Sequence, residues 1–302
     1  MNENSLVWNV IFTPGTFRYL QRLTASLVEN TTARFRLVAN GCPAAEREAI
    51  AAAAAARIDA YTLPGDGVVP HGRALTHLFD TFADGENFCF VDSDVLARGP
   101  WIAFLLDALD GHAAVTSCDV AWTDDNVLPE GAEDLVGRHT VGADGFVYGS
   151  SFLALYRRRP VTAVRDRFGV TFAACAHDHL GADARRGIER TGRAFRLYDT
   201  AKALNLLLRS DGDTITHVAH PTLRHLGGIS QYLSQVQPVV PIHRAGVRRL
   251  EFAGWAAALL VALTDGTRPP PVPVAVDSAV ATEIADALGA LFARGPGEDD
   301  RR

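Results

Sequence analysis

The first 120 residues alternate between short apolar runs and stretches in which apolar residues recur at helical spacing, and this pattern limits the fold more than any other feature of the 302-residue chain. Strand-length apolar runs that alternate with helices are typical of βα units and a mostly parallel sheet. We therefore expect an α/β fold with such a sheet flanked by helices. The expected strands are residues 7–12, 35–39, 58–63, 88–91 and 113–117.

Helical signals fill the spaces between these strands. Apolar residues recur at positions 17, 20, 23 and 27, an alanine-rich segment covers 44–56, and Gly99-Pro100-Trp101 precedes a third helical pattern. After residue 120 the alternation weakens. Residues 119–150 are polar and contain glycine, which is typical of loops that bind substrate beyond the edge of a sheet.

The second half of the chain predicts fewer regular elements. We expect a strand at 151–156 followed by a basic turn at 157–160, and a helix that begins at Asp199 and stops near Gly212. A proline-rich linker at 268–273 separates these from a last amphipathic helix at 278–292, and the tail at 295–302 is expected to be disordered.

Charge and composition exclude several classes of partner and location. A formal net charge of -6 provides no general basic surface for a nucleic acid. The amino terminus lacks the basic cluster of a secretory signal, and the apolar stretch at 255–263 is about half of the ~20 residues that span a bilayer. We therefore expect a cytoplasmic protein without a transmembrane segment. The four cysteines lie far apart, which favours reduced thiols over a zinc site or a disulfide framework.

Two carboxylates follow the apolar strand at 88–91 directly, in the sequence Asp92-Ser93-Asp94. Ligands of open α/β sheets bind at the carboxyl ends of the strands. Two aspartates there are suited to hold a hard divalent cation, Mn²⁺ or Mg²⁺, which prefers oxygen ligands and bridges to substrate phosphates. The alternative is that Asp92 and Asp94 are only turn and capping residues before the next helix.

At this point the chain resembles the GT-A fold glycosyltransferases, and more particularly the bacterial enzymes of the family 2 type. The resemblance covers about residues 5–230. It is carried, in chain order, by VWNVIFTPGT, LVANGC, HGRALTHLF, FCFVDSDVLA, YDTAKALNLLLRSDG and HLGGIS. It implies a GT-A-like domain at 1–245, with a donor half at about 1–120 and an acceptor half at about 121–245, and carboxyl-terminal helices at 246–294 that pack on it.

The resemblance also implies roles for single residues. On the donor side, Thr13 and Asn40 would contact the base and ribose, and His71-Gly72-Arg73 would lie by the diphosphate, where Asp92 and Ser93 also belong. The metal would be held by Asp92, Asp94 and a distant histidine, for which we select His225 in His225-Leu226-Gly227-Gly228. A buried core histidine is the alternative for His225, and a helix-start turn is the alternative for His71-Gly72.

An inverting enzyme of this kind needs a base that takes the proton of the acceptor hydroxyl. Asp199 is the first candidate and Asp178 the second, although the family's acidic pair has lost its first member here, since Tyr198 precedes Asp199. Helix capping is the alternative role of Asp199.

The function implied is a metal-dependent, hexosyltransferase-like glycosyltransferase (EC 2.4). Its donor would be a UDP-, GDP- or dTDP-linked sugar, and its acceptor a small molecule, a glycan or a peptide. Three alternatives stay open. The first is a sugar-nucleotide nucleotidyltransferase, although the loop at 13–16 lacks the basic, glycine-rich cradle that would hold a triphosphate. The second is a catalytically silent glycan-binding module, and the third is a metal-dependent hydrolase. The hydrolase would use His177, Asp178, His179, His217, His220 and His225.

Overall fold

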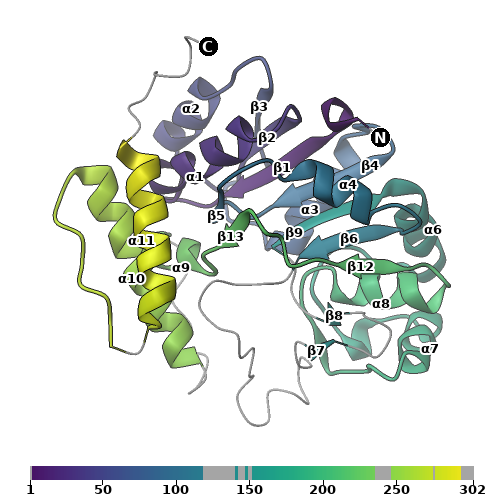
Figure 1. The fold of residues 1–302 in the computed structure, drawn as a ribbon. Helices are drawn as coiled ribbons and strands as arrows, with labels where there is room; N and C mark the ends of the chain where they lie inside the picture. The colour runs from purple at the N-terminus through teal and green to yellow at the C-terminus, as the bar shows by residue number, and fades with distance from the viewer. Residues whose placement is uncertain are drawn as a thin grey trace.

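The described chain is built around a seven-stranded sheet, which confirms the expected α/β class with a mostly parallel sheet flanked by helices (Figure 1). The computed structural model describes residues 2–117, 140–141, 147–148, 152–234, 246–274 and 276–293. The strands lie in the order β12-β6-β9-β4-β1-β2-β3. They are β1 (Val7–Phe12), β2 (Arg34–Ala39), β3 (Ile58–Thr62), β4 (Asn87–Val91), β6 (Ala114–Ser117), β9 (Leu153–Arg157) and β12 (Ile215–His217).

Strand β9 is antiparallel to both of its neighbours, β4 and β6, whereas the other paired strands of the sheet are parallel. The chain runs outward from β1 to β2 and β3, and then returns to the other side of β1 to form β4. The strand order therefore reverses between β1 and β4. In open α/β sheets such a switch point is where ligands bind.

Helices cover both faces of the sheet because successive strand residues face opposite sides. In β4, Phe88 and Phe90 belong to one apolar core and Cys89 and Val91 to the other. The helices of the first half are α1 (Phe17–Glu29), α2 (Ala44–Ala52), α3 (His71–Thr81) and α4 (Ile102–Ala108). Those of the second half are α6 (Arg158–Phe168), α7 (Ala182–Arg190), α8 (Lys202–Ser210), α9 (Ile229–Leu233), α10 (Gly246–Asp265) and α11 (Ser278–Ala293).

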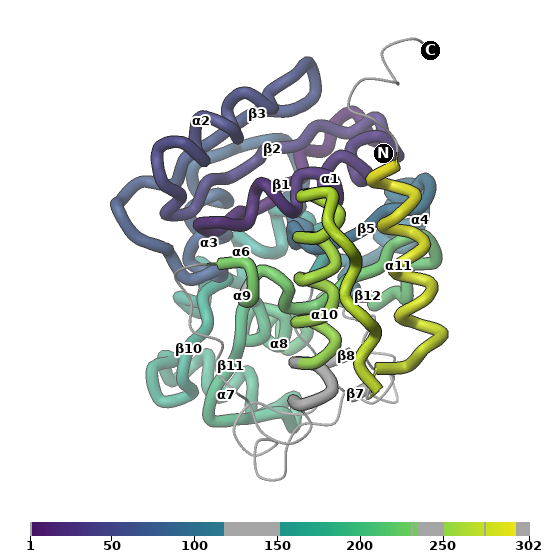
Figure 2. Tube along the Cα trace, turned by 90° about the vertical axis from the view of Figure 1, so that its left-hand side faces the viewer, coloured from purple at the N-terminus to yellow at the C-terminus, as the bar shows by residue number. Residues whose placement is uncertain are grey.

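Helices α10 and α11 lie side by side next to α1 in both views (Figures 1 and 2). Their buried residues Phe252 and Ile284 belong to the same apolar core as Leu23 of α1. The carboxyl-terminal helices therefore complete the core on that face of the sheet. No helix in the described ranges combines the length and the apolar character that a membrane crossing requires.

Short elements connect this framework. They are η1 (Glu3–Ser5), β5 (Val95–Ala97), β7 (Thr140–Val141), β8 (Val147–Tyr148), β10 (Cys175–Ala176), η2 (His177–His179), β11 (Leu197–Tyr198) and β13 (Leu223–His225). The small sheets pair β10 with β11, β13 with β5 and β7 with β8. The rest of the loop expected at 119–150 and the tail at 295–302 lie outside the described residues.

Two differences from the sequence prediction concern the starts of helices in the second half of the chain. The basic turn expected at 157–160 is instead the start of α6, where Pro160 is tolerated because the N–H groups of a first helical turn have no intrahelical partner. Arg158 donates there to the carbonyl oxygens of Asn87, Phe79 and Phe82. The helix expected to begin at Asp199 begins at Lys202.

Candidate metal and nucleotide site

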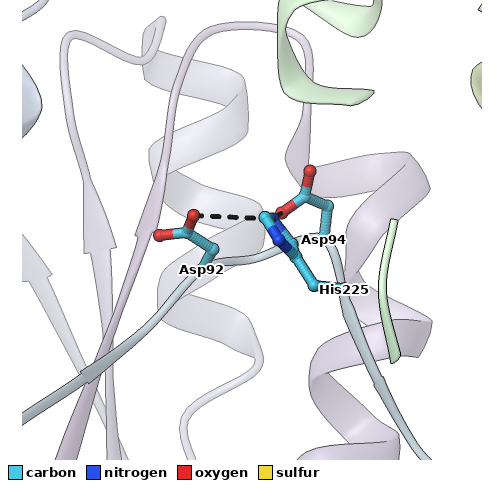
Figure 3. A group of neighbouring side chains, drawn as sticks. All are labelled: Asp92, Asp94 and His225. Atoms are coloured by element: carbon cyan, nitrogen blue, oxygen red, sulfur yellow. Dashed lines mark ion pairs between the residues drawn. The ribbon is translucent and has the colours of Figure 1, made fainter. Parts of the chain in front are cut away.

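The two aspartates lie at the carboxyl end of β4, which is next to β1 in the sheet. Strand β5 follows them and pairs antiparallel with β13, so that Val95 lies opposite His225. This pairing brings His225 to the acidic pair across about 130 residues of chain (Figure 3). Its Nε2 atom lies 3.2 Å from Asp94 Oδ1 and 3.7 Å from Asp92 Oδ2.

The three side chains turn toward one another and form a compact donor set (Figure 3). One ligand atom from each of Asp92, Asp94 and His225 lies within 4.8 Å of the others. Two carboxylates and an imidazole are a set that binds Mn²⁺ or Mg²⁺ together with water or phosphate oxygens. The residues therefore fit a divalent cation, and the structure brings together the three residues that were selected as candidate ligands from the sequence.

Backbone amides hold Asp94 in place from the opposite side. The N–H groups of Gly228 and Ile229 donate to Asp94 Oδ2 at 3.0 and 3.2 Å, and the N–H of Leu226 donates to the Asp94 carbonyl at 3.0 Å. Gly227 and Gly228 have φ angles of 69° and 85°, a left-handed conformation that favours glycine. The Gly-Gly turn thus orients one Asp94 oxygen and leaves the other beside His225.

Phe152 contacts the site in two ways and was not identified from the sequence. Its ring stacks on the imidazole of His225, with ring centroids 4.5 Å apart, and its carbonyl oxygen accepts the N–H of Asp92 at 2.7 Å. Phe152 lies in the expected strand 151–156, but a pattern within one strand carries no signal for a partner more than 70 residues away.

Electrostatics distinguish the two aspartates. Burial raises the pKa of the Asp92 carboxyl from 3.8 to about 6, and the nearby Asp94 and Asp199 act in the same direction, whereas His71 and His225 oppose them. Burial also acts to raise the pKa of Asp94. There the charge and hydrogen bond of His225, with the Ile229 N–H, outweigh burial and hold the pKa below its usual value.

The segment His71-Gly72-Arg73 begins α3, and within it His71 lies next to Asp92. His71 Nε2 is 3.8 Å from Asp92 Oδ1, and its ring meets the ring of Phe90 edge to face. Gly72 has a packing role, because a Cβ atom there would lie 2.3 Å from the Phe172 carbonyl oxygen. Arg73 is exposed.

The expected nucleoside contacts lie at the ends of β1 and β2. Thr13 lies in a turn after β1, where Thr16 Oγ1 donates to its carbonyl at 2.7 Å. Glu46 fixes this turn by accepting the N–H groups of Gly15 and Phe17, both at 2.8 Å. Asn40 is buried at the end of β2. Ser93, between the aspartates, is buried as well.

A cavity of about 370 Å³ opens at the carboxyl ends of β1, β2 and β3. Its lining includes Pro14 after β1, Cys42 and Pro43 after β2, and Thr62 at the end of β3. These strands are neighbours in the sheet, on the side of β1 opposite β4. The cavity and the acidic pair therefore lie along the same edge of the sheet.

The two candidate bases, Asp199 and Asp178, have different surroundings. Asp199 is exposed, its charge acts on Asp92, and its Oδ1 accepts the Thr200 N–H at 2.7 Å. It is not the N-cap of α8, a position held by Ala201 at a φ of 62°. Left-handed alanine is strained, and such strain clusters at functional sites. Asp178 is exposed in η2.

Other histidines have local partners. His220 is buried and its Nε2 lies 2.8 Å from the Trp101 carbonyl oxygen, His217 contacts Thr116 Oγ1, and His177 Nδ1 lies 2.8 Å from the Tyr198 hydroxyl. Across the part of the chain that the structure describes, Asp92, Asp94 and His225 are the group that meets metal-ligand spacing. The histidine set of the hydrolase alternative is therefore not assembled into one site there.

Neither a protein-family model nor a curated protein matches the sequence. Among solved structures, similar folds include the galactosyltransferase LgtC in complex with donor and acceptor sugar analogs (TM-score 0.44, 14% identity, 87% of this chain and 97% of that chain). They also include the bifunctional glycosyltransferase WbbM (0.41, 14%, 71% and 39%) and the 4-diphosphocytidyl-2C-methyl-D-erythritol synthase of Anaerococcus prevotii (0.39, 10%, 71% and 89%). With TM-scores below 0.5, these likenesses carry no conclusion about activity.

Proposed function

We propose that the chain is a metal-dependent glycosyltransferase that moves a sugar, as a hexosyltransferase does, from a nucleotide-diphosphate donor to an acceptor. The observation that carries the proposal is the group of Asp92, Asp94 and His225 at the carboxyl end of β4. It lies at the point where the strand order reverses, which is where α/β sheets bind nucleotides.

Transfer of a glycosyl group leaves negative charge on the departing diphosphate. A bound divalent cation, Mn²⁺ or Mg²⁺, supplies positive charge for that diphosphate. Asp94 and His225 would hold it, with Asp92 as a third ligand or a contact through water. The Gly228 and Ile229 amides keep Asp94 in its orientation, so little reorganisation is needed when the donor binds.

In this proposal the donor occupies the half of the chain at about 1–120. Thr13 and Ser93 would lie along it, with His71-Gly72-Arg73 beside the diphosphate, and Asn40 would act indirectly, because its side chain holds the backbone of Val69. The acceptor, a small molecule, glycan or peptide, would occupy the half at about 121–245. Asp199 would take the proton of the acceptor hydroxyl in an inverting reaction, with Asp178 as the alternative. The location proposed for the reaction is the cytoplasm.

The proposal is tested by calorimetric titration of UDP, GDP and dTDP with and without Mn²⁺. We expect binding that requires the cation, and its loss in Asp94→Ala and in His225→Ala. The exposed His179→Ala is the matched control and should bind as the unchanged protein does. Nucleotide affinity that persists undiminished in EDTA would rule out the metal site.

A product assay separates the alternatives. A glycosyltransferase releases a nucleoside diphosphate from a nucleotide sugar, whereas a nucleotidyltransferase releases pyrophosphate from a nucleoside triphosphate and a sugar phosphate. A silent glycan-binding module would do neither. The donor screen should therefore include both substrate pairs, each with Mn²⁺ and Mg²⁺.

A further inference from the structure

The cavity at the ends of β1, β2 and β3 has one wall made by the loop at 63–70, and that loop is anchored. Asn40 Nδ2 donates to the Val69 carbonyl at 2.8 Å, and the Val69 N–H donates to Asn40 Oδ1 at 2.7 Å. The loop also packs closely on Gly41, where a Cβ atom would lie 2.7 Å from the Val68 nitrogen. These contacts fix the part of the loop that precedes α3, and Gly65 and Asp66 in its outer part line the cavity.

Opposite charges line this cavity. Asp66 lies on the loop, and Arg47 lies on α2. Arg47 donates to the Cys42 carbonyl through Nη1 at 2.9 Å, which leaves other N–H groups of its guanidinium for a ligand. Within the described ranges Asp66 takes part in no hydrogen bond or ion pair with other residues. Pro14, Cys42 and Pro43 add apolar surface, so the cavity offers an acceptor pair, a donor and flat apolar contacts.

The cavity lies where the base of a nucleotide would lie if the diphosphate of that nucleotide were bound at the end of β4. Strands β4, β1 and β2 are consecutive neighbours in the sheet (Figure 1). At about 4.8 Å per strand, the end of β2 is roughly 10 Å from the end of β4. A ribose and a diphosphate together are long enough to cover the distance between these two strand ends.

The geometry points to this cavity as a base pocket that selects guanine, with Asp66 accepting from N1–H and the 2-amino group and Arg47 donating to O6. The inference rests on the proposed function, because it takes the diphosphate to lie by Asp92 and Asp94. It adds the donor class, which would be a GDP-linked sugar.

Guanine suits these groups better than the other bases do. A carboxylate offers two acceptors side by side, and guanine presents two neighbouring donors next to the O6 acceptor. Uracil and thymine present one N–H between two carbonyl oxygens, so one Asp66 oxygen can accept that N–H while the other faces a carbonyl oxygen. Adenine and cytosine each present one amino group beside a ring nitrogen acceptor. Each of these bases therefore leaves an Asp66 oxygen facing an acceptor or without a partner.

The test is calorimetric titration of the full chain with GDP, UDP, ADP, CDP and dTDP in the presence of Mn²⁺. We expect GDP to bind about 10-fold or more tightly than the others, on the scale of one bidentate base contact. The variant Asp66→Asn replaces one acceptor with a donor. It should lose the preference for GDP and bind xanthosine diphosphate better, because xanthine carries a carbonyl where guanine carries its amino group.

Controls keep the two proposals apart. Glu48→Gln changes an exposed acid next to Arg47 on α2 and should leave the order of affinities unchanged. If UDP or dTDP binds as tightly as GDP, or if Asp66→Asn keeps the GDP preference, the guanine inference is wrong while the proposed transferase stands. Guanosine monophosphate measured in EDTA probes the pocket alone. If it outbinds uridine monophosphate but no diphosphate responds to Mn²⁺, the guanine pocket stands and the proposed metal-dependent function fails.

Discussion

Phe152 shows how a side chain without ionisable chemistry can organise the candidate metal site. Its ring lies against His225 and its carbonyl holds the Asp92 backbone, so one residue restrains two of the three expected ligands. Groups that orient a ligating histidine commonly alter metal affinity by about 10- to 100-fold. The effect of Phe152 should therefore be larger on metal binding than on folding.

We predict that Phe152→Leu weakens Mn²⁺ affinity roughly 10-fold, because the imidazole loses its stacking face while the backbone hydrogen bond stays. Calorimetry of metal binding measures this effect. Phe88→Leu is the control, since Phe88 is equally buried, at 2% exposed, but lies in the other apolar core. The two substitutions should lower the free energy of unfolding by similar amounts. Equal metal affinities in the two variants would show that Phe152 only fills space.

Asp92 should make metal affinity depend on pH. Its pKa of about 6 means that the folded, metal-free protein takes up a proton there, whereas the unfolded chain stays ionised to about pH 3.9. The free energy of unfolding of the metal-free protein should therefore rise as pH falls from about 7 to about 5. Metal binding needs the ionised carboxylate, so Mn²⁺ affinity should fall over the same range.

Melting temperatures with and without Mn²⁺ across this pH range measure both effects. Asp92→Asn is the control, because an amide does not titrate, and it should remove this component of both slopes. A wild-type protein whose metal-free stability falls on acidification no less steeply than that of Asp92→Asn would contradict the raised pKa.

Asp199 and Asp178 are distinguished by their surroundings. We predict that Asp199→Asn lowers turnover about 10²-fold or more and leaves donor affinity unchanged, because a general base contributes on that scale. Asparagine keeps the oxygen that accepts the Thr200 N–H, so the turn before α8 is preserved. Asp178→Asn is the matched control and should stay active. The reverse result would exchange the two roles, and loss in neither would leave the acceptor proton to the departing diphosphate.

At the scale of elements, the sequence predicts those strands and helices whose apolar pattern extends over enough residues to be recognised. Strand β1 has the predicted bounds, and β4 and the helix at α11 differ from prediction by one residue at an end. Strand β13 was not predicted as a strand, because three residues carry no measurable period. Yet β13 is the element that carries His225 to the acidic pair. The two aspartates were selected from their residue type and position and His225 through the family resemblance, whereas the geometry of the three depends on the long-range pairing of β13 with β5.

The start of α3 gives a test of an element contact. We predict that Gly72→Ala destabilises the fold by about 1–3 kcal/mol, because its Cβ would collide with the main chain at Phe172 and Ala173. Urea unfolding measures the change. The control is Gly67→Ala in the exposed loop before α3, where a Cβ meets nothing within 4 Å and the change should stay within about 0.5 kcal/mol. Equal effects in the two variants would exclude the close approach as the reason for Gly72.

At the scale of the whole molecule, two kinds of contact join α11 to the rest. Glu283 accepts hydrogen bonds from Arg98 at 2.6 Å and from Arg224 at 2.9 Å, and Arg224 is the neighbour of His225. Ile284, the next residue along the helix, is buried in the core shared with α1. The ion pairs are more than a third exposed at Glu283, so solvent screens them, whereas burial of Ile284 removes apolar surface from water.

We therefore predict that Ile284→Ala lowers the free energy of unfolding by about 2–5 kcal/mol, the usual cost of removing a buried isoleucine side chain, and that Glu283→Gln lowers it by less than about 1 kcal/mol. Because the helices at 246–293 share a core with α1, the loss should appear as a shift of one cooperative transition in circular dichroism and in tryptophan fluorescence, to which the buried Trp8, Trp101 and Trp255 contribute. Two separate transitions in Ile284→Ala, with only the first one shifted, would instead make the carboxyl-terminal helices an independent folding unit. A large loss in Glu283→Gln would mean that the ion pairs, and not the apolar core, hold α11 beside the strand that carries His225.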